Sequence, residues 1–392
     1  MKIKVKPEDF LVDELTDLPI GKSGEWAVYC LEKKCWNTLD AIRWLCRELK
    51  VSSHHIAYGG KKDRYGITRQ YITIRSPHPH QITHDNITLN YLGRSSEPMG
   101  PKRITGNRFQ VVVRRLTPEV ALQAIREAEL VRIFGFPNYF DDQRFGSFDR
   151  LQGFWAEKVL KRQFNGAVKI LLTSIHPEDK SSEKQRKRYF FDHWRMWEEC
   201  REMAVTPFEK KAFDHLLRQP FDFLSVLFQL PREEASLMIA AYQSYLWNSV
   251  LAAVIENSDF NASFSTKGKA GSYIFFRRIP KKDWLFWHEL HIPTIAAQME
   301  PLSPRIGDIY RNIMEKDGLI HPMFNQIKYR KAFFSSFLRK GTVIPGELNV
   351  SSSADEIYEG YEKLCLSFEL PRGCYATMLL KRLLEIPPAL KS

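Results

Sequence analysis

Residues 58–74, YGGKKDRYGITRQYITI, join a basic loop with two glycines to a polar run that has the alternating pattern of a β-strand. The loop carries one carboxylate, Asp63, and its nearest cations are Lys61, Lys62, Arg64 and Arg69. Nearby positive charge favours the ionised form of an aspartate, which keeps it available as a nucleophile or a base. The same cations could bind the phosphates that flank a nucleotide. The alternative is a surface loop whose aspartate only balances its lysines.

Several other kinds of site do not fit this loop. A phosphate-binding P-loop needs GxxxxGK followed by Ser or Thr, whereas here the second glycine precedes Lys-Lys-Asp. A dinucleotide site needs GxGxxG, and a carboxylate metal site needs companion acids that the loop lacks. The cysteines at 30, 35, 46, 200, 365 and 374 form no CxxC pair, and no His/Cys cluster has zinc spacing. The sequence therefore predicts no metal site and reduced thiols that fill core space.

Composition and charge narrow the class of protein. The chain has 392 residues, enough for one very large domain or two ordinary ones, and 44% of them are hydrophobic. Lys and Arg total 58 against 46 for Asp and Glu, a net charge of +12, which favours nucleic acid over a membrane surface as a partner. The start, MKIKVKPEDF, has no apolar signal region, and no uninterrupted apolar run is long enough to span a bilayer. We expect a cytoplasmic protein with no membrane partner.

The first third of the chain has a mixed α and β pattern. Residues 25–32, 70–75 and 108–114 have the apolar patterns of strands. A helix is expected from Thr38, taken as its N-cap, and another after Leu116, where a Thr cap precedes a Pro at the first helical position. The helices thus fall between strands.

The pattern changes after about Gly153. Residues 154–164 and 230–251 predict helices, and the charged run at 179–191 is interpreted as a solvated loop or as a phosphate-contacting patch. The tail alternates as a strand at 362–371 and then has the pattern of an amphipathic helix. A strand and helix after a long helical stretch suggest that the middle is an insertion, and that the tail completes the sheet begun by the first third.

Ordered motifs from Lys4 to Thr377 resemble the TruD family of tRNA pseudouridine synthases. GKKDRYGITRQ at 60–70 is similar to the family's GxKDxxAxTxQ, and KVKPEDFLVDE at 4–14 to its KxxPEDFxVxE. The other similar segments are GNRF at 106–109, PNYFDDQRFG at 137–146, SYLWN at 244–248 and LPRGCYAT at 370–377. Two departures occur. Asp141 stands where the family usually has Gly, and Gly66 stands where it usually has Ala, which is interpreted as a mild change.

The resemblance implies an α+β fold. It predicts a pseudouridine-synthase catalytic core with a mixed or antiparallel sheet flanked by helices, formed by residues 1–153 and 340–392. A mainly helical α+β TRUD domain, residues 154–339, is inserted into this core. The cleft between the two is expected to be basic and to hold tRNA.

The same resemblance implies isomerisation of uridine to pseudouridine in tRNA, at uridine 13 of the D-arm, without metal, nucleotide or redox cofactor. Asp63 is the expected catalytic carboxylate, with Lys4 as its positive partner. Aromatic faces suit a flipped base, and an amide suits the edge of uracil. The expected base-binding residues besides Lys4 are Phe10, Asn138, Phe140 and Tyr375. The candidates for RNA-backbone contacts are Lys61, Lys62, Arg64 and Arg144. A monomer is favoured.

Two other classes remain open at this point. One is a non-catalytic tRNA-binding or folding chaperone on the same scaffold, which would gain little from an acid that faces phosphates. The other is a different RNA-modifying enzyme, such as a methyltransferase or a deaminase. The missing glycine-rich nucleotide motif and the missing zinc spacing count against the second class.

Overall fold

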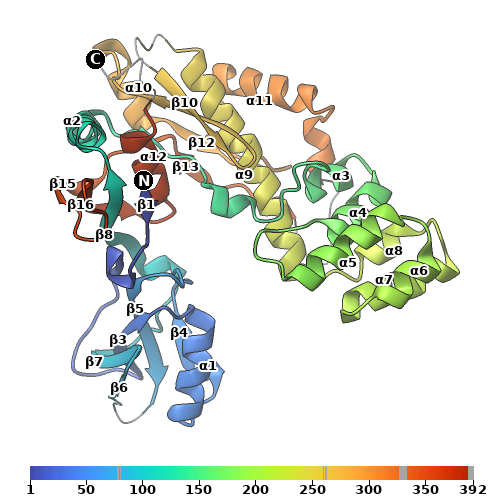
Figure 1. Cartoon of the computed structure of the whole chain (residues 1–392), viewed down its shortest axis with the longest axis horizontal. Coiled ribbons are helices and arrows are strands. Elements are labelled where there is room, and N and C mark those ends of the chain that lie inside the picture. The colour runs from blue at the N-terminus through green and yellow to red at the C-terminus, as the bar shows by residue number, and fades with distance from the viewer. Residues whose placement is uncertain (77–78, 80, 259, 261–262, 326–332, 387–392) are drawn as a thin grey trace. The chain divides into compact units, whose positions relative to one another are not determined.

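The chain forms two units in the computed structural model, which describes residues 1–76, 79, 81–258, 260, 263–325 and 333–386 (Figure 1). The first unit is discontinuous, Met1–Phe136 and Val343–Ser392, and the second is Pro137–Thr342. The first boundary between the two units falls after Phe136. The sequence pattern changes later, after about Gly153. The reason is packing: the short 3₁₀ helix η4 (Asp142–Phe145) contacts a helix of the second unit, so the PNYFDDQRFG segment belongs there.

The first unit is built on one large sheet. Its ten strands are β1 (Lys2–Ile3), β2 (Phe10–Thr16), β3 (Trp26–Lys34), β4 (Ile56–Tyr58), β5 (Ile67–Arg75), β6 (Ile82–His84), β7 (Ile87–Ser95), β8 (Ile104–Leu116), β15 (Gly346–Ala354) and β16 (Glu362–Pro371). The order is β15-β16-β8-β2-β5-β3-β7-β6, with β1 against β8 and β4 against β5. The β2–β5 pair is parallel and the other pairs are antiparallel. The sheet is therefore mixed, as predicted.

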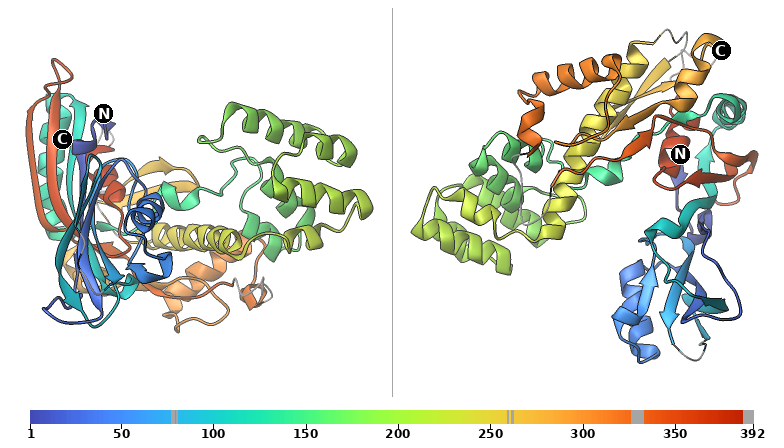
Figure 2. Two further views of the ribbon diagram at one scale, coloured as in Figure 1. Left: turned by 90° about the horizontal axis from the view of Figure 1, so that it is seen from below. Right: turned by 180° about the vertical axis from the view of Figure 1, so that it is seen from behind.

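The C-terminal tail completes this sheet. β16 pairs with β8 from Glu362↔Leu116 to Pro371↔Gly106, and Figure 2 shows the red C-terminal strands in the same sheet as the blue N-terminal ones. The alternating burial of β16 places Leu364, Leu366 and Phe368 on the core side. The period-2 pattern of the sequence predicted this strand and its place correctly.

Helix α1 (Thr38–Glu48) covers one end of the sheet. Its buried Ala41, Ile42 and Leu45 share a core with residues of β3, β5 and β7. Its N-cap is Asn37, whose side-chain oxygen accepts a 2.8 Å hydrogen bond from the Asp40 amide, and not Thr38 as predicted. Thr38 is fully buried instead, and its hydroxyl donates to Gln70 Oε1 at 2.9 Å.

Helices α2 (Pro118–Phe134) and α12 (Ala376–Leu384) pack against each other. Thr117 occupies the N-cap position of α2 and Pro118 begins the helix, as predicted, although the Thr117 side chain accepts no capping hydrogen bond. Arg382 of α12 donates to Glu127 of α2 at 2.7 Å, and both side chains are fully buried. The tail thus contributes a strand and a helix to the first unit.

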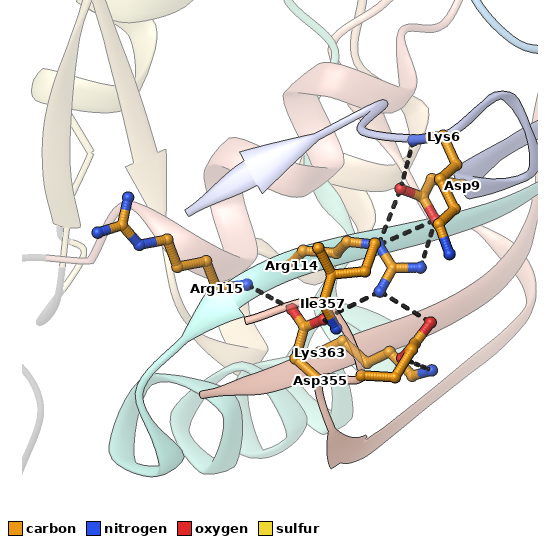
Figure 3. Close-up of polar contacts among 8 residues, drawn as sticks. Lys6, Asp9, Arg114, Arg115, Asp355, Ile357 and Lys363 are labelled. Atoms are coloured by element: carbon orange, nitrogen blue, oxygen red, sulfur yellow. Dashed lines mark hydrogen bonds and ion pairs between the residues drawn. The ribbon is translucent and has the colours of Figure 1, made fainter. Parts of the chain in front are cut away.

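A buried polar cluster joins the N-terminal motif to the C-terminal hairpin (Figure 3). Arg114 of β8 donates to both oxygens of Asp9, the last residue of the 3₁₀ helix η1 (Pro7–Asp9), and to Asp355 after β15 at 3.0 Å. Burial alone would raise the pKa of Asp9, but its hydrogen bonds from Arg114 and from the Lys6 amide outweigh burial and lower that pKa. The cluster fixes the turn that separates Lys4 from Phe10.

The second unit is mainly helical. Its helices are α3 (Trp155–Leu160), α4 (Phe164–Thr173), α5 (Ser181–Asp192), α6 (Trp197–Met203), α7 (Pro207–Arg218), α8 (Phe223–Leu227), α9 (Arg232–Glu256), α10 (Trp284–Glu289) and α11 (Pro304–Lys316). Two small antiparallel sheets accompany them, β10 (Ser263–Gly268) with β11 (Gly271–Phe276), and β12 (His291–Pro293) with β13 (Leu338–Lys340). Strands β9 (Phe136–Pro137) and β14 (Thr342–Val343) also pair with each other.

Helix α9 is the central element of the second unit. It contacts α3, α11, β11 and β12, and Trp247 on it donates to the Ile292 carbonyl at 2.9 Å. Its length and composition would allow it to cross a membrane, but 67% of its most apolar window is buried inside the structure. It is therefore a core helix of this unit.

The charged segment at 179–191 is not a loop. Most of it forms α5, and Phe190 is its buried contact with the core. Arg186 pairs with Glu209 at 3.0 Å, and Lys187 pairs with Asp179 at 2.8 Å and with Glu183 at 2.9 Å. The loop prediction was wrong because the apolar signal of this helix is weak, whereas its charges pair within the unit.

Candidate active site

Asp63 and Lys4 meet in the first unit. The Lys4 ammonium lies 2.9 Å from Asp63 Oδ2 and 4.0 Å from the centroid of the Phe10 ring. Lys4 has a left-handed backbone (φ +59°), and the turn held by Asp9 brings its side chain back over the first residue of β2. The aspartate carboxylate, the ammonium and an aromatic face thus come together from two segments that are 59 positions apart in the chain.

Lys62, the residue before Asp63, fixes the loop that carries the carboxylate. Lys62 forms an ion pair with the fully buried Glu14 at 2.7 Å and donates to Asn107 Oδ1 at 2.5 Å. The Lys62 amide donates to the Thr38 hydroxyl at 2.9 Å. The Lys62 side chain is only 9% exposed, so this lysine holds the loop against β2 and β8. Its predicted contact with an RNA phosphate is not the role that this geometry favours.

Lys61 and Arg64 are exposed, in contrast to Lys62. Together with Arg43, Lys62 and Asp63 they line a pocket of about 380 Å³ between the loop and the start of α1. Four cationic residues thus line a hollow beside Asp63; Arg43 pairs with Asp40 and Lys62 with Glu14, and the exposed Lys61 and Arg64 offer positive charge of the kind that a phosphate backbone binds.

Phe10 belongs to a row of aromatic side chains from three neighbouring strands, β2, β8 and β16. It contacts Phe109 of the GNRF motif edge-on, with ring centroids 6.3 Å apart, and Phe109 stacks on Phe368 at 5.2 Å. Phe10 is 4% exposed, and the Lys4 ammonium lies over the face of its ring, at the end of this row. Tyr375 also belongs to the first unit, where it is half-buried at the N-cap position of α12.

Gly66 corrects one expectation from the sequence. Its φ is +139°, and a Cβ there would lie 2.4 Å from the Phe10 carbonyl oxygen. Replacement of the family's usual Ala by Gly is therefore not a mild change in this chain. The loop after Asp63 runs so close to β2 that only glycine fits.

We expect Gly66→Ala to destabilise the first unit by about 1–3 kcal/mol, because the backbone must leave a conformation that L-residues rarely adopt. Thermal melting measures this loss. Gly100→Ala is the matched control, since Gly100 lies in the same unit and a Cβ there meets nothing within 4 Å. An unchanged melting temperature in Gly66→Ala would show that the loop does not hold this backbone conformation.

The other candidate residues lie in the second unit. Asn138 is buried, its Nδ2 donates to the Lys340 carbonyl at 3.0 Å, and its Oδ1 accepts from Arg339 at 2.8 Å. Phe140 is buried against Trp247, and the Arg339 guanidinium lies 4.0 Å from the centroid of its ring. Arg144 donates to the Ser244 hydroxyl at 3.2 Å. The PNYF segment is thus held by β13 and α9.

The SYLWN motif explains how this segment is fixed. Asn248 of α9 accepts a hydrogen bond from the Phe140 amide at 2.9 Å and donates to the Phe140 carbonyl at 2.8 Å. Asp141, in place of the family's usual Gly, is buried and precedes η4.

Several residues of these two regions were not singled out from the sequence. Lys33, Glu14 and Asn107 hold the Asp63 loop, and Arg339 holds the PNYF segment. Glu14 and Asn107 lie inside two of the family motifs, KVKPEDFLVDE and GNRF, so these motifs could have identified them. Lys33 and Arg339 lie outside the motifs, and their roles come from tertiary contacts. Within the described residues, no group of three or more His, Cys, Asp or Glu side chains is placed to hold a metal ion.

Comparison with known proteins gives one consistent result. The family described as "tRNA pseudouridine synthase D (TruD)" matches residues 1–270 and 286–383. The tRNA pseudouridine synthase D of Leptospira interrogans is 31% identical over 97% of this chain and 95% of its own length. The Aquifex aeolicus protein of the same name is 30% identical over 98% of both chains. A crystal structure of a protein from Methanosarcina mazei that is assigned to TruD has the same fold, with a TM-score of 0.77 and 23% identity over 100% of this chain and 94% of that one. The chain therefore belongs to the TruD family of tRNA pseudouridine synthases, which isomerise uridine to pseudouridine in tRNA.

Proposed function

We propose that this enzyme converts uridine 13 in the D-arm of tRNA to pseudouridine, with Asp63 as its catalytic carboxylate and without a cofactor. The observation that carries the proposal is the geometry around Asp63. Its carboxylate lies in an ion pair with Lys4, beside an aromatic ring, in a loop whose backbone is anchored on both sides. Such an anchored carboxylate can serve as a nucleophile or as a base.

The reaction needs few groups. The C1′–N1 bond breaks, the uracil rotates, and a C5–C1′ bond forms. The C5 proton is lost to solvent and N1 gains a proton, so that the product is an isomer of the substrate. A single carboxylate that reacts with the sugar or the base, or that accepts the C5 proton, is sufficient for this balance. No electron donor or acceptor takes part.

A flipped nucleotide needs surfaces for its base and cations for its phosphates. Phe10 and Tyr375 are proposed as surfaces for the base, and stacking contributes about 1–3 kcal/mol per base. Phe10 is 4% exposed and the Lys4 ammonium lies over its ring, so a base could stack on Phe10 only after the Lys4 side chain moves. Lys61 and Arg64 are exposed beside Asp63 and are proposed to bind the adjacent phosphates.

Asn138, Phe140 and Arg144 are proposed as contributions of the second unit to substrate binding. The Asn138 amide is already bonded to Arg339 and Lys340, so reading a uracil edge would require it to exchange these bonds. Lys62 is proposed to act on the loop and not on the RNA, because Glu14 and Asn107 occupy its ammonium.

Mapping of the product tests the proposed position. Purified protein is incubated with an unmodified tRNA transcript and no cofactor, and pseudouridines are located by carbodiimide-stopped primer extension. We expect a stop at position 13, and no stop in a transcript that carries cytidine there. A stop at another uridine would keep the chemistry and overturn the position. No stop despite tight tRNA binding would favour the non-catalytic tRNA binder.

Lys4→Met should slow catalysis without unfolding the protein. We expect the single-turnover rate to fall about 10- to 100-fold, because the Asp63 carboxylate loses the group that orients it. Stability should change by about 1 kcal/mol or less, since the side chains of the pair are 25% and 41% exposed. The matched control is Lys2→Met, two residues earlier on β1. Equal rates in both variants would remove Lys4 from the site.

We further propose that the enzyme acts as a monomer, and that it acts in the cytoplasm because tRNA is its substrate. Size-exclusion chromatography with light scattering, run at the protein concentration of the activity assay, measures whether the active species has the mass of a monomer. Activity that appears only with a dimer peak would contradict it.

A further inference from the structure

Lys33 is a buried lysine beside the Asp63 loop. It lies near the end of β3, where it is opposite Thr68 of β5 and Ile87 of β7 in the middle of the sheet. The residue is 1% exposed, which is unusual for a lysine, whose ammonium is costly to remove from water. A buried lysine therefore needs strong partners.

The partners of Lys33 are two backbone carbonyls. Its Nζ donates to the Trp36 carbonyl at 2.6 Å and to the Asp63 carbonyl at 2.9 Å. Trp36 precedes the N-cap of α1, so one ammonium joins the β3–α1 connection to the loop that carries Asp63. Two lysines therefore bind Asp63: Lys33 donates to its backbone carbonyl, and Lys4 donates to its carboxylate.

Burial and two charged neighbours shift the pKa of Lys33. Burial lowers the pKa of Lys33 to about 8, the nearby Asp63 carboxylate opposes this shift, and the nearby Lys62 ammonium adds to it. Among the described residues, the Lys33 ammonium donates to these two carbonyl oxygens and to no carboxylate. An apolar side chain of similar length would avoid the cost of burying the charge, so packing alone does not account for a lysine here.

We propose that Lys33 is a positioning residue for the isomerisation: its buried ammonium fixes the Asp63 backbone so that the carboxylate is held at the reacting nucleotide. This inference rests on the proposed catalytic role of Asp63. Lys33 itself touches no substrate in this account, and it acts through the Asp63 carbonyl.

The test compares Lys33→Met with Lys34→Met. Lys34 is the next residue, and it forms an exposed ion pair with Glu8 at 2.6 Å. We expect Lys33→Met to lower the single-turnover rate about 10- to 100-fold while the Kd for tRNA changes less than about threefold. Lys34→Met should retain the wild-type rate. Thermal melting of both variants establishes that the protein is folded under the assay conditions.

The pH profile separates positioning from a purely structural role. The wild-type rate should fall as pH rises through about 8, because Lys33 loses its charge there. Lys33→Met has no such group, so its lower rate should lack this alkaline limb. A folded Lys33→Met protein with the wild-type rate and the wild-type profile would overturn the proposal.

Two further outcomes keep the test decisive. If Lys33→Met does not fold, it is replaced by Lys33→Gln, whose side chain keeps a neutral hydrogen-bond donor. Independently of any variant, a wild-type rate that stays constant between pH 7 and 9 would overturn the proposal. Asp63→Asn is run in parallel. Full turnover in Asp63→Asn would refute the proposed function, whereas an inactive Asp63→Asn with a fully active Lys33→Met would refute the role of Lys33 alone.

Discussion

Asp63→Asn should bind tRNA and fail to convert it. The substitution keeps the shape of the side chain and removes its charge, so the nucleophile or base is lost while Lys61 and Arg64 still offer their cations. We expect the single-turnover rate to fall by about 10³-fold or more, as is typical when the group that carries the chemistry is removed. Release of tritium from tRNA labelled at uridine C5 measures this rate.

A matched variant controls for the lost charge. Asp17 is an exposed aspartate of the same unit that lies 3.7 Å from Arg103, and Asp17→Asn should retain the wild-type rate. The Kd for tRNA should stay within about threefold for both variants. Loss of binding in Asp63→Asn would assign Asp63 to the RNA interface and leave the catalytic group unidentified.

Arg114→Met should be the most destabilising of these substitutions. The methionine leaves Asp9 and Asp355 buried without their cation, and breaking a buried ion pair by removing one partner costs about 3–5 kcal/mol. Native-state hydrogen exchange of the β8 amides measures the free energy of opening this part of the sheet (Figure 3). Arg115→Met is the control, because Arg115 is the exposed neighbour and only its backbone amide contacts Asp355.

The pH dependence of this loss follows from the lowered pKa values of Asp9 and Asp355. A carboxyl group whose pKa is lower in the folded state adds stability above its unfolded pKa of about 3.9, and this stability is lost as pH falls through the folded value. The difference in stability between wild type and Arg114→Met should therefore be full near pH 6 and shrink below about pH 4. A difference that is constant from pH 6 to pH 3 would mean that the arginine stabilises the fold by packing alone.

Periodic patterns predicted the sheet well. The alternation of residues 362–371 depends only on one buried face, which is a local property, so β16 and its return to the first unit could be predicted. The start of α2 was predicted because Thr-Pro is a local signal. The N-cap of α1 was misplaced by one residue because Asn37 and Thr38 are both good caps, and tertiary contacts of Thr38 with Gln70 decide between them.

The division between the units could not be predicted from composition. The residue pattern changes near Gly153, but the PNYF segment packs on α9, more than a hundred residues later in the chain. Helix α5 was missed for a related reason. Its charges suggest a solvated loop, and the pairs that neutralise Arg186 and Lys187 appear only in the folded unit.

The loop around Asp63 shows the same limit at the scale of single residues. Lys61, Lys62 and Arg64 are equivalent in the sequence, yet Lys62 is held by Glu14 while the other two are exposed. The signature identified the carboxylate that Lys4 contacts. It did not show that Lys33 binds the backbone of this loop or that Gly66 must be glycine, because both depend on the distance of the loop from β2 and β3.

The most direct test of the central claim maps pseudouridine in one tRNA transcript after incubation with saturating wild-type enzyme or Asp63→Asn. The account predicts a carbodiimide stop at uridine 13 with the wild type. It predicts none with Asp63→Asn, even after an incubation about ten times longer than the wild type requires, because a rate lowered about 10³-fold would convert only about 1% of the tRNA in that time. A stop at position 13 that develops at the wild-type rate in Asp63→Asn would contradict the account.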